Sequence, residues 1–166
     1  MGPKKDVIDI VTELGGKKTN ESAQKLIEER LDATNLAKLS PIKNESVLRK
    51  IANAIVLCDP DSVFINTASD EDRQFIRDLS IEKGEESKLS MENHTIHYDL
   101  KDEQGRIIDR TFYIHNEGEE VNSLAKLMDR SDAFKDIQDK MTGIMRGKTM
   151  MIGFYLRGPV DAGAPT

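Results

Sequence analysis

Apolar residues recur at helical spacing in the first third of the chain, with charged residues on the opposite side. A helix is expected over residues 21–38 with Asn20 as its N-cap, and a second helix is expected to start at Asn44. The second helix should stop before Pro60, because proline restricts the residue before it and has no N–H for the helical ladder. This second helix has the wider apolar stripe, formed by Val47, Leu48, Ile51, Ala54, Ile55 and Leu57.

Residues 62–66 form a short apolar segment that predicts a strand, and a helix ending at Gly84 should follow it. Ser69 is the expected N-cap of this helix, and Asp72, three residues on, makes a variant of the capping box. The side chains expected to face inward are Phe75, Ile76 and Leu79. We interpret this strand–turn–helix unit as structural, because its acidic helix start repels a phosphate.

The second half of the chain predicts further strands and helices. Residues 94–100 and 111–115 alternate polar and apolar side chains, which indicates half-buried strands. Helical regions are expected at 123–128 and at 132–145, and a last strand at 150–156. The predicted fold class is therefore α/β, with a mixed β-sheet flanked by helices.

Composition then limits the class of function. A chain of 166 residues suits one domain, and its net charge of −6 argues against a nucleic-acid partner, which requires a basic face. The single cysteine, Cys58, excludes an internal disulfide, and we interpret it as a small buried apolar group. No apolar run approaches the ~20 residues of a membrane span, so we predict a soluble, cytoplasmic protein without a membrane partner.

Residues 143–149 nearly match a Walker A phosphate loop, but they have three residues rather than four before the Gly147-Lys148 pair. A phosphate loop also follows a strand and opens a helix, whereas here a helical pattern precedes the motif and a strand pattern follows it. We therefore interpret this segment as a helix-end glycine that leads into a core strand.

Other candidate chemistry is sparse. His94 and His97 are three residues apart, so on a strand they would point to opposite faces, and with His115 distant in sequence no metal site is predicted. Arg106 and Arg110 flank a short apolar pair ahead of a strand, where a guanidinium can hold a carboxylate or phosphate. The local sequence by itself favours surface salt bridges for both arginines.

Three segments, in order, resemble one family, the GTP-type phosphoenolpyruvate carboxykinases. Residues 58–65 and 68–72 are similar to the family's Cys-x-Pro-Asp strand and Gly-Ser-x-Glu-Glu helix start. Residues 105–111 resemble its Ala-Arg-[Ile/Val]-Glu-Ser-Lys-Thr segment. Residues 145–159 resemble its Met-[Lys/Arg]-Gly-Arg-[Thr/Glu]-Met-Tyr…Phe…Gly-Pro segment, and residues 94–99 look like the archaeal-type members.

The resemblance implies the N-terminal, substrate-binding part of an enzyme that converts oxaloacetate and GTP to phosphoenolpyruvate, GDP and CO2 in gluconeogenesis, with Mn2+ and Mg2+. It implies that Arg106 holds a carboxylate of oxaloacetate or phosphoenolpyruvate. The family's glutamate two residues further on is Ile108 here, so its polar support is missing. The family's phosphate loop, reactive cysteine, metal ligands and guanine pocket are expected outside this chain, so no catalytic, cofactor-binding or metal-binding residue is assigned to it.

The resemblance also suggests a division of the chain. We predict a helical N-terminal extension at residues 1–44 and an incomplete, carboxykinase-like substrate-binding domain at residues 45–166. Our first hypothesis is that the chain is a monomeric part of such an enzyme and has no turnover by itself. The alternative is a non-catalytic binding or interaction module that keeps the same scaffold.

Overall fold

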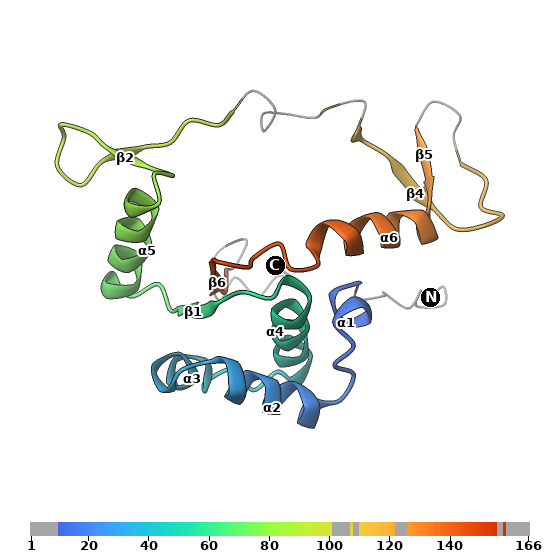
Figure 1. The fold of residues 1–166 in the computed structure, drawn as a ribbon, viewed down its shortest axis with the longest axis horizontal. Coiled ribbons are helices and arrows are strands. Elements are labelled where there is room, and N and C mark those ends of the chain that lie inside the picture. Colours follow the sequence, from blue (N-terminus) through green and yellow to red (C-terminus); the bar gives the residue numbers. More distant parts are fainter. Residues whose placement is uncertain (1–9, 101–106, 108–109, 122–125, 156–157, 159–166) are drawn as a thin grey trace.

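The computed structural model describes residues 10–100, 107, 110–121, 126–155 and 158. Helices and strands follow one another along the chain, and the two parallel strands at the centre come from residues far apart in sequence (Figure 1). The elements are α1 (Ile10–Gly15), α2 (Asn20–Arg30), α3 (Ala33–Leu39), α4 (Glu45–Cys58), β1 (Ser62–Asn66), α5 (Asp70–Glu82), β2 (Ser87–Lys88), β3 (Thr95–Ile96), β4 (Tyr113–His115), β5 (Leu127–Asp129), α6 (Arg130–Met141) and β6 (Thr149–Gly153).

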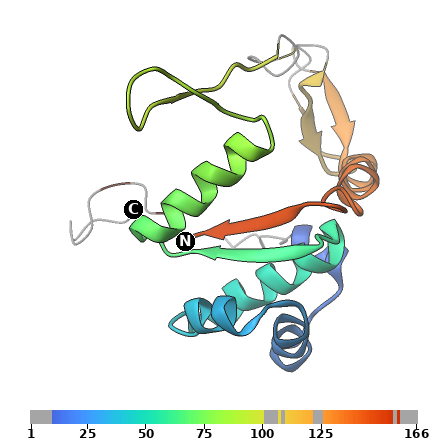
Figure 2. The ribbon, with the colours of Figure 1, turned by 60° about the vertical axis from the view of Figure 1, so that its left-hand side comes forward.

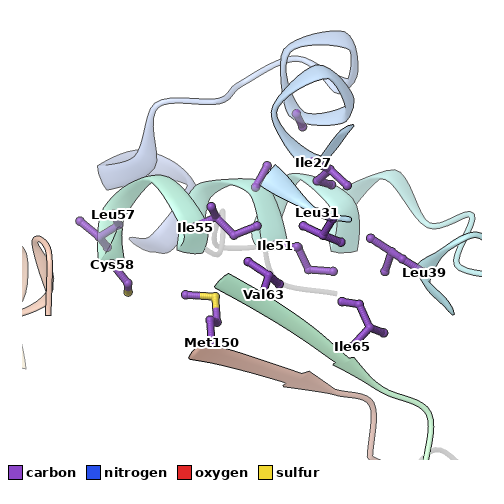
Figure 3. Packing of buried hydrophobic residues seen from close by; sticks show 12 residues of the cluster. Ile27, Leu31, Leu39, Ile51, Ile55, Leu57, Cys58, Val63, Ile65 and Met150 are labelled. Carbon is purple, nitrogen blue, oxygen red and sulfur yellow. The ribbon is translucent and has the colours of Figure 1, made fainter. Parts of the chain in front are cut away.

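Helix α4 lies at the centre of the core. The side chain of Asn44 accepts hydrogen bonds from the backbone N–H groups of Ser46 and Val47, so the predicted start of this helix is confirmed. The helix ends as predicted before Pro60, with Asp59 in the left-handed region at φ 49°. Its buried apolar side chains pack between the first helices and the β1–β6 pair, as Figure 3 shows.

The parallel pairing of β1 with β6 gives the core its second layer. Val63 lies opposite Met150, and both side chains are buried on the α4 side of the sheet. Alternate residues point the other way, so Phe64 and its register partner Met151 face the side on which α5 lies (Figure 2). Phe75 of α5 stacks on Phe64 but is itself 44% exposed, which corrects the prediction that it faces fully inward. The β1–β6 sheet is therefore covered by α4 on one face and by α5 on part of the other.

A buried asparagine attaches the first helix to α4. The side chain of Asn53 accepts a hydrogen bond from the Lys17 N–H at 2.6 Å and donates to the Lys17 carbonyl at 3.0 Å. Gly15 packs directly against it, and a Cβ at Gly15 would come within 2.5 Å of the Asn53 Cβ. The end of α1 thus contacts α4 too closely for any larger residue.

The single helix expected over residues 21–38 is two helices, which corrects the sequence prediction. Thr19 rather than Asn20 is the N-cap of the first helix, and this helix ends at Arg30. Asp32 starts α3 by accepting a hydrogen bond from the Asn35 N–H at 2.8 Å, and this bond holds the pKa of Asp32 below its ordinary value. The apolar spacing continues through Leu31, which is buried, so periodicity gave no sign of the break.

The predicted ends of the later elements are also wrong in part. The strands at 94–100 and 111–115 shrink to the two residues of β3 and the three residues of β4, because each pairs with a partner of the same short length. The helix expected at 123–128 is wrong for Leu127 and Met128, which belong to β5. Helix α6 ends at Met141 instead of residue 145, because the Gly143 N–H bonds to the Leu57 carbonyl rather than within the helix.

The fold class predicted from the sequence is confirmed. The described strands form a parallel β1–β6 pair, an antiparallel β2–β3 pair and a parallel β4–β5 pair, with helices beside them. Within the described residues, no helix is both long enough and apolar enough to cross a bilayer.

Candidate functional site

The predicted substrate residue, Arg106, lies outside the described residues, but part of the turn after it is described. The Arg110 N–H donates to the Ile107 carbonyl at 2.9 Å, and the Thr111 hydroxyl donates to the same carbonyl at 2.9 Å. Arg110 is exposed. Two hydrogen bonds therefore converge on the carbonyl of Ile107, the residue after position 106 and ahead of β4.

The Gly147-Lys148-Thr149 motif forms a tight turn into β6, as the sequence indicated. Gly147 has φ 75°, and its N–H donates to Asp61 Oδ1 at 2.8 Å. The Lys148 carbonyl accepts from the Asp61 N–H at 3.0 Å. A carboxylate of the same chain thus occupies the backbone donor that a phosphate would need in a Walker A loop.

The segment before this turn covers the C-terminal end of α4. The N–H groups of Gly143 and Met145 donate to the carbonyls of Leu57 and Cys58, both at 2.9 Å, and so satisfy groups left over at the helix end. Gly143 has φ 67° and follows Thr142, the C-cap of α6, so the glycine that ends this helix is Gly143 and not Gly147, as the sequence had indicated.

Two arginines hold Asp59 beside this helix end. Arg146 Nε lies 2.9 Å from Asp59 Oδ2, and an Arg30 nitrogen lies 3.6 Å from Asp59 Oδ1. The hydrogen bond from Arg146 holds the pKa of Asp59 below its usual value. The family-like segment around residue 146 is therefore held at the end of α4 by backbone hydrogen bonds and by the Arg146–Asp59 ion pair.

A second buried polar group, Asp72, lies in the first turn of α5, close to Thr67 just after β1. Its carboxylate accepts from Lys38 Nζ at 2.5 Å, from the Thr67 N–H at 2.8 Å and from the Thr67 hydroxyl at 2.7 Å. The Lys38 hydrogen bond is the main cause that lowers the pKa of Asp72 to about 2, although burial opposes it. Asp72 is 4% exposed, so the ion pair is largely shielded from water.

This arrangement refines the predicted capping box. Ser69 caps α5 as expected, because its hydroxyl accepts from the Asp72 N–H at 3.1 Å. The Asp72 side chain reaches back past Ser69 to Thr67 and across to Lys38 on α3. The sequence missed Lys38 because it lies 34 residues away, and no short-range pattern joins the two positions.

Because β1 and β6 are parallel, their carboxyl ends lie at the same end of the sheet. Open α/β sheets bind ligands at this end. There the Tyr155 ring lies against Gly153, where an added Cβ would be 2.7 Å from the Tyr155 hydroxyl oxygen. Asn66 Nδ2 approaches that hydroxyl at 3.5 Å. The exposed Tyr155 ring and the half-buried Asn66 amide therefore meet at this end of the sheet.

The described surface has several clefts. One of them, of 610 Å³, lies between α5 and the start of β6. A second, of 410 Å³, lies among α2, α3 and α4, and a third, of 290 Å³, lies between α5 and the β2–β3 turn. Each of these clefts has both apolar and basic side chains in its lining.

The histidines do not meet at one point. His94 Nδ1 pairs with the Glu92 carbonyl at 2.8 Å, and His97 bonds to the Glu85 carbonyl at 2.6 Å and to Asp99 at 3.0 Å. Within the described part of the chain, no three His, Cys, Asp or Glu side chains gather as metal ligands would. Cys58 is buried, and its burial raises the pKa of its thiol, so the predicted role as a small core residue is confirmed.

Comparison with known proteins places this scaffold in a family. Residues 49–166 match the model of the phosphoenolpyruvate carboxykinase N-terminal domain. A phosphoenolpyruvate carboxykinase [GTP] of Pyrococcus furiosus is 37% identical over 143 residues, which cover 86% of this chain and 23% of that protein. Proteins of the same name are 38% identical in Thermococcus sibiricus, over 82% of this chain and 22% of that protein, and 33% identical in Saccharolobus solfataricus, over 74% and 20%.

The chain therefore belongs to the phosphoenolpyruvate carboxykinase N-terminal domain family, and the resemblance found in its motifs is confirmed. It spans less than a quarter of the length of the curated relatives that it matches.

Proposed function

We propose that this chain is the substrate-binding, N-terminal part of a phosphoenolpyruvate carboxykinase that converts oxaloacetate and GTP to phosphoenolpyruvate, GDP and CO2. The observation that carries the proposal is the match over residues 49–166, together with relatives that share the name phosphoenolpyruvate carboxykinase [GTP]. Such a protein would serve gluconeogenesis in the cytoplasm as a monomer, with residues 1–44 as a helical extension of the domain.

Arg106 is the residue proposed to hold a substrate carboxylate. A guanidinium offers two parallel N–H donors to a carboxylate and so fixes both the position and the plane of the acid. The hydrogen bonds from Arg110 and Thr111 to the Ile107 carbonyl support this role, because they hold the residue next to position 106. Orientation of the acid matters because phosphoryl transfer depends chiefly on positioning and charge stabilisation.

GTP and the divalent ions, Mn2+ or Mg2+, are proposed to bind the portion of the enzyme for which this chain has no counterpart. The relatives that carry the GTP-dependent name are more than four times as long as the segments that they share with this chain. We therefore expect no GTP-dependent phosphoenolpyruvate formation from the isolated chain at any enzyme concentration. Turnover by the purified 166-residue chain would contradict this division of roles.

The proposed role of Arg106 is tested in a fusion of this chain with the unmatched remainder of the Pyrococcus furiosus relative. The fusion should form phosphoenolpyruvate from oxaloacetate, GTP and Mn2+. Arg106→Ala should raise KM for oxaloacetate at least tenfold, because a charged hydrogen bond contributes about 1.5–3 kcal/mol.

Arg110→Ala is the matched control, because it removes an exposed arginine four residues further on. It should change KM less than twofold. Equal kinetics for the two variants would remove Arg106 from the substrate site. A folded fusion with no turnover would favour the alternative of a non-catalytic module on the same scaffold.

A further inference from the structure

The side chain of Thr111 makes a hydrogen bond to the residue that follows the proposed substrate arginine. Its hydroxyl donates to the Ile107 carbonyl at 2.9 Å, and the Arg110 N–H donates to the same oxygen at 2.9 Å. A carbonyl oxygen has two lone pairs and can accept both bonds. The Arg110 bond comes from the backbone, so any residue except proline can make it. The Thr111 bond, by contrast, depends on the hydroxyl of that one side chain.

Thr111 also lies directly ahead of a paired strand. Strand β4 begins two residues later, where the Tyr113 N–H donates to the Lys126 carbonyl at 2.8 Å and Tyr113 lies opposite Leu127 of β5 (Figure 1). The chain from β4 therefore leads back to Thr111, and the Thr111 hydroxyl leads on to Ile107. Thr111 is thus the side chain that links the β4–β5 pair to the residue after position 106.

The exposure of Thr111 argues for a local role rather than a role in general stability. Thr111 and Arg110 are exposed and Ile107 is half-buried, so their hydrogen bonds lie at the surface. The loss of a surface hydrogen bond usually changes the free energy of unfolding little. The same bond still limits the backbone beside position 106, and a binding group that is held in advance loses less entropy when its ligand arrives.

We propose that Thr111 is a positioning residue for Arg106 and acts through the Ile107 carbonyl. The hydroxyl holds the backbone next to the arginine, so that the guanidinium binds a carboxylate of oxaloacetate or phosphoenolpyruvate with less rearrangement. Thr111 itself touches no substrate. This proposal rests on the proposed function, because that function assigns the substrate carboxylate to Arg106.

The chemistry of threonine predicts a graded series of variants. Valine has the same branched shape but no donor, so Thr111→Val removes the hydrogen bond and keeps the shape. Serine keeps the donor but lacks the methyl group that restricts rotation about χ1, so Thr111→Ser keeps the bond in a less constrained form. Substrate affinity should therefore fall in the order wild type, Thr111→Ser, Thr111→Val.

The direct test uses the fusion with the unmatched remainder of the Pyrococcus furiosus relative, with oxaloacetate as the varied substrate. Thr111→Val should raise KM for oxaloacetate about fivefold, because a neutral hydrogen bond changes an equilibrium by a factor of about 2 to 12. The values of kcat and of KM for GTP should change less than about twofold, because Arg106 holds the acid. Thr111→Ser should restore KM for oxaloacetate to within about twofold of the wild type. An unchanged KM in the valine variant would overturn the proposal.

Thr142→Val is the matched control. The Thr142 hydroxyl also donates to the carbonyl four residues earlier, that of Gln138, at 2.6 Å, and Thr142 is exposed as well. The two substitutions therefore remove the same kind of bond, one beside position 106 and the other at the C-cap of α6. Thr142→Val should change KM for oxaloacetate by less than about 1.5-fold. Equal effects of the two variants would show a general structural cause and would contradict a positioning role.

A double-mutant cycle separates positioning from an independent structural effect. In an Arg106→Ala fusion the guanidinium is absent, so Thr111→Val should raise KM further by less than about 1.5-fold. The same fivefold ratio in both backgrounds would exclude action through Arg106. Thr111→Ala, which also lacks the donor, takes the place of the valine variant if that variant does not fold, and the same ratios are expected.

The outcomes separate this proposal from the proposed function. An unchanged KM after Arg106→Ala would overturn the function and the positioning role together. A strong effect of Arg106→Ala with none from Thr111→Val would overturn the positioning role alone. If the fusion has no turnover, calorimetry measures its binding of phosphoenolpyruvate, and the dissociation constants should follow the same order of variants. The absence of any binding would overturn both proposals.

Discussion

The two regions of this molecule differ in how much of their apolar surface they bury. The region formed by α1–α4, β1 and β6 encloses one continuous cluster, which includes Ile55 at 0% exposure and Ile65 at 1%. The region formed by β2–β5 and α6 contains a single buried hydrophobic residue among those described, Ala133. Its exposed apolar side chains are Leu89, Met91, Tyr98, Leu100, Phe112, Tyr113, Ile114 and Leu127.

The difference indicates that the first region is stable by its own packing, whereas the second depends on further contacts. Two-stranded sheets of two or three residues bury too little surface to be stable by themselves. An exposed apolar surface of this kind marks an interaction site in folded proteins. The first region is thus a packed core, whereas the second leaves apolar side chains open to solvent.

The largest expected effect comes from a cavity in the first region. Ile55→Ala should lower the free energy of unfolding by about 3–4 kcal/mol, because the fully buried site loses apolar contacts and leaves a void. Leu127→Ala, at a side chain 42% exposed in β5, should cost less than about 1 kcal/mol. Urea unfolding of both variants measures the contrast, and similar losses would show that the two regions share one core.

The next effect comes from the ion pair that joins α3 to the start of α5. Lys38→Met leaves the buried Asp72 carboxylate without its amine and should cost about 2 kcal/mol at pH 7. Lys135→Met breaks an exposed pair with Asp139 on α6 and should cost less than about 0.5 kcal/mol. Equal losses in urea unfolding would contradict a shielded pair.

The pH dependence of this pair has a defined sign. The pKa of Asp72 in the folded chain is about 2, below the ordinary 3.8, so the folded state favours the ionised form. Its contribution to stability is complete above about pH 4 and is lost as the pH falls toward 2. The stability difference between the wild type and Asp72→Asn should shrink over that window, and a constant difference would rule out the pair as its source.

The smallest effect concerns the turn that leads into β6. Gly147→Ala should cost about 1 kcal/mol, because φ 75° is unfavourable for alanine although nothing lies within 4 Å of the added carbon. Lys148→Ala next to it should change stability by less than about 0.5 kcal/mol. A neutral Gly147→Ala in thermal unfolding would show that the turn relaxes at no cost.

The first region was also the more predictable from sequence. Asn44 is a cap whose effect is local, and the stripe of α4 repeats at helical spacing, so this helix was found. The break before Asp32 was missed because Leu31 continues the apolar spacing. Local patterns carry no information on which residues far apart in sequence come into contact.

The second region and the site were less predictable for the same reason. Strand β5 exists because Leu127 pairs with Tyr113, and no local sequence pattern near Leu127 predicts that pairing. The contact of Lys38 with Asp72 likewise joins positions far apart in sequence. Arg106 was chosen through family resemblance, which carries long-range information that local spacing lacks, and its role remains the proposal made above.

The contrast between the two regions is tested most directly by native-state hydrogen exchange of the isolated chain. Amides of α4 and β1 should be protected to nearly the full free energy of unfolding, because they lie within the buried cluster. Amides of β4 and β5 should exchange within about tenfold of the unfolded rate. Uniform protection across both regions would contradict the account, because it would show that the second region is already complete without a partner.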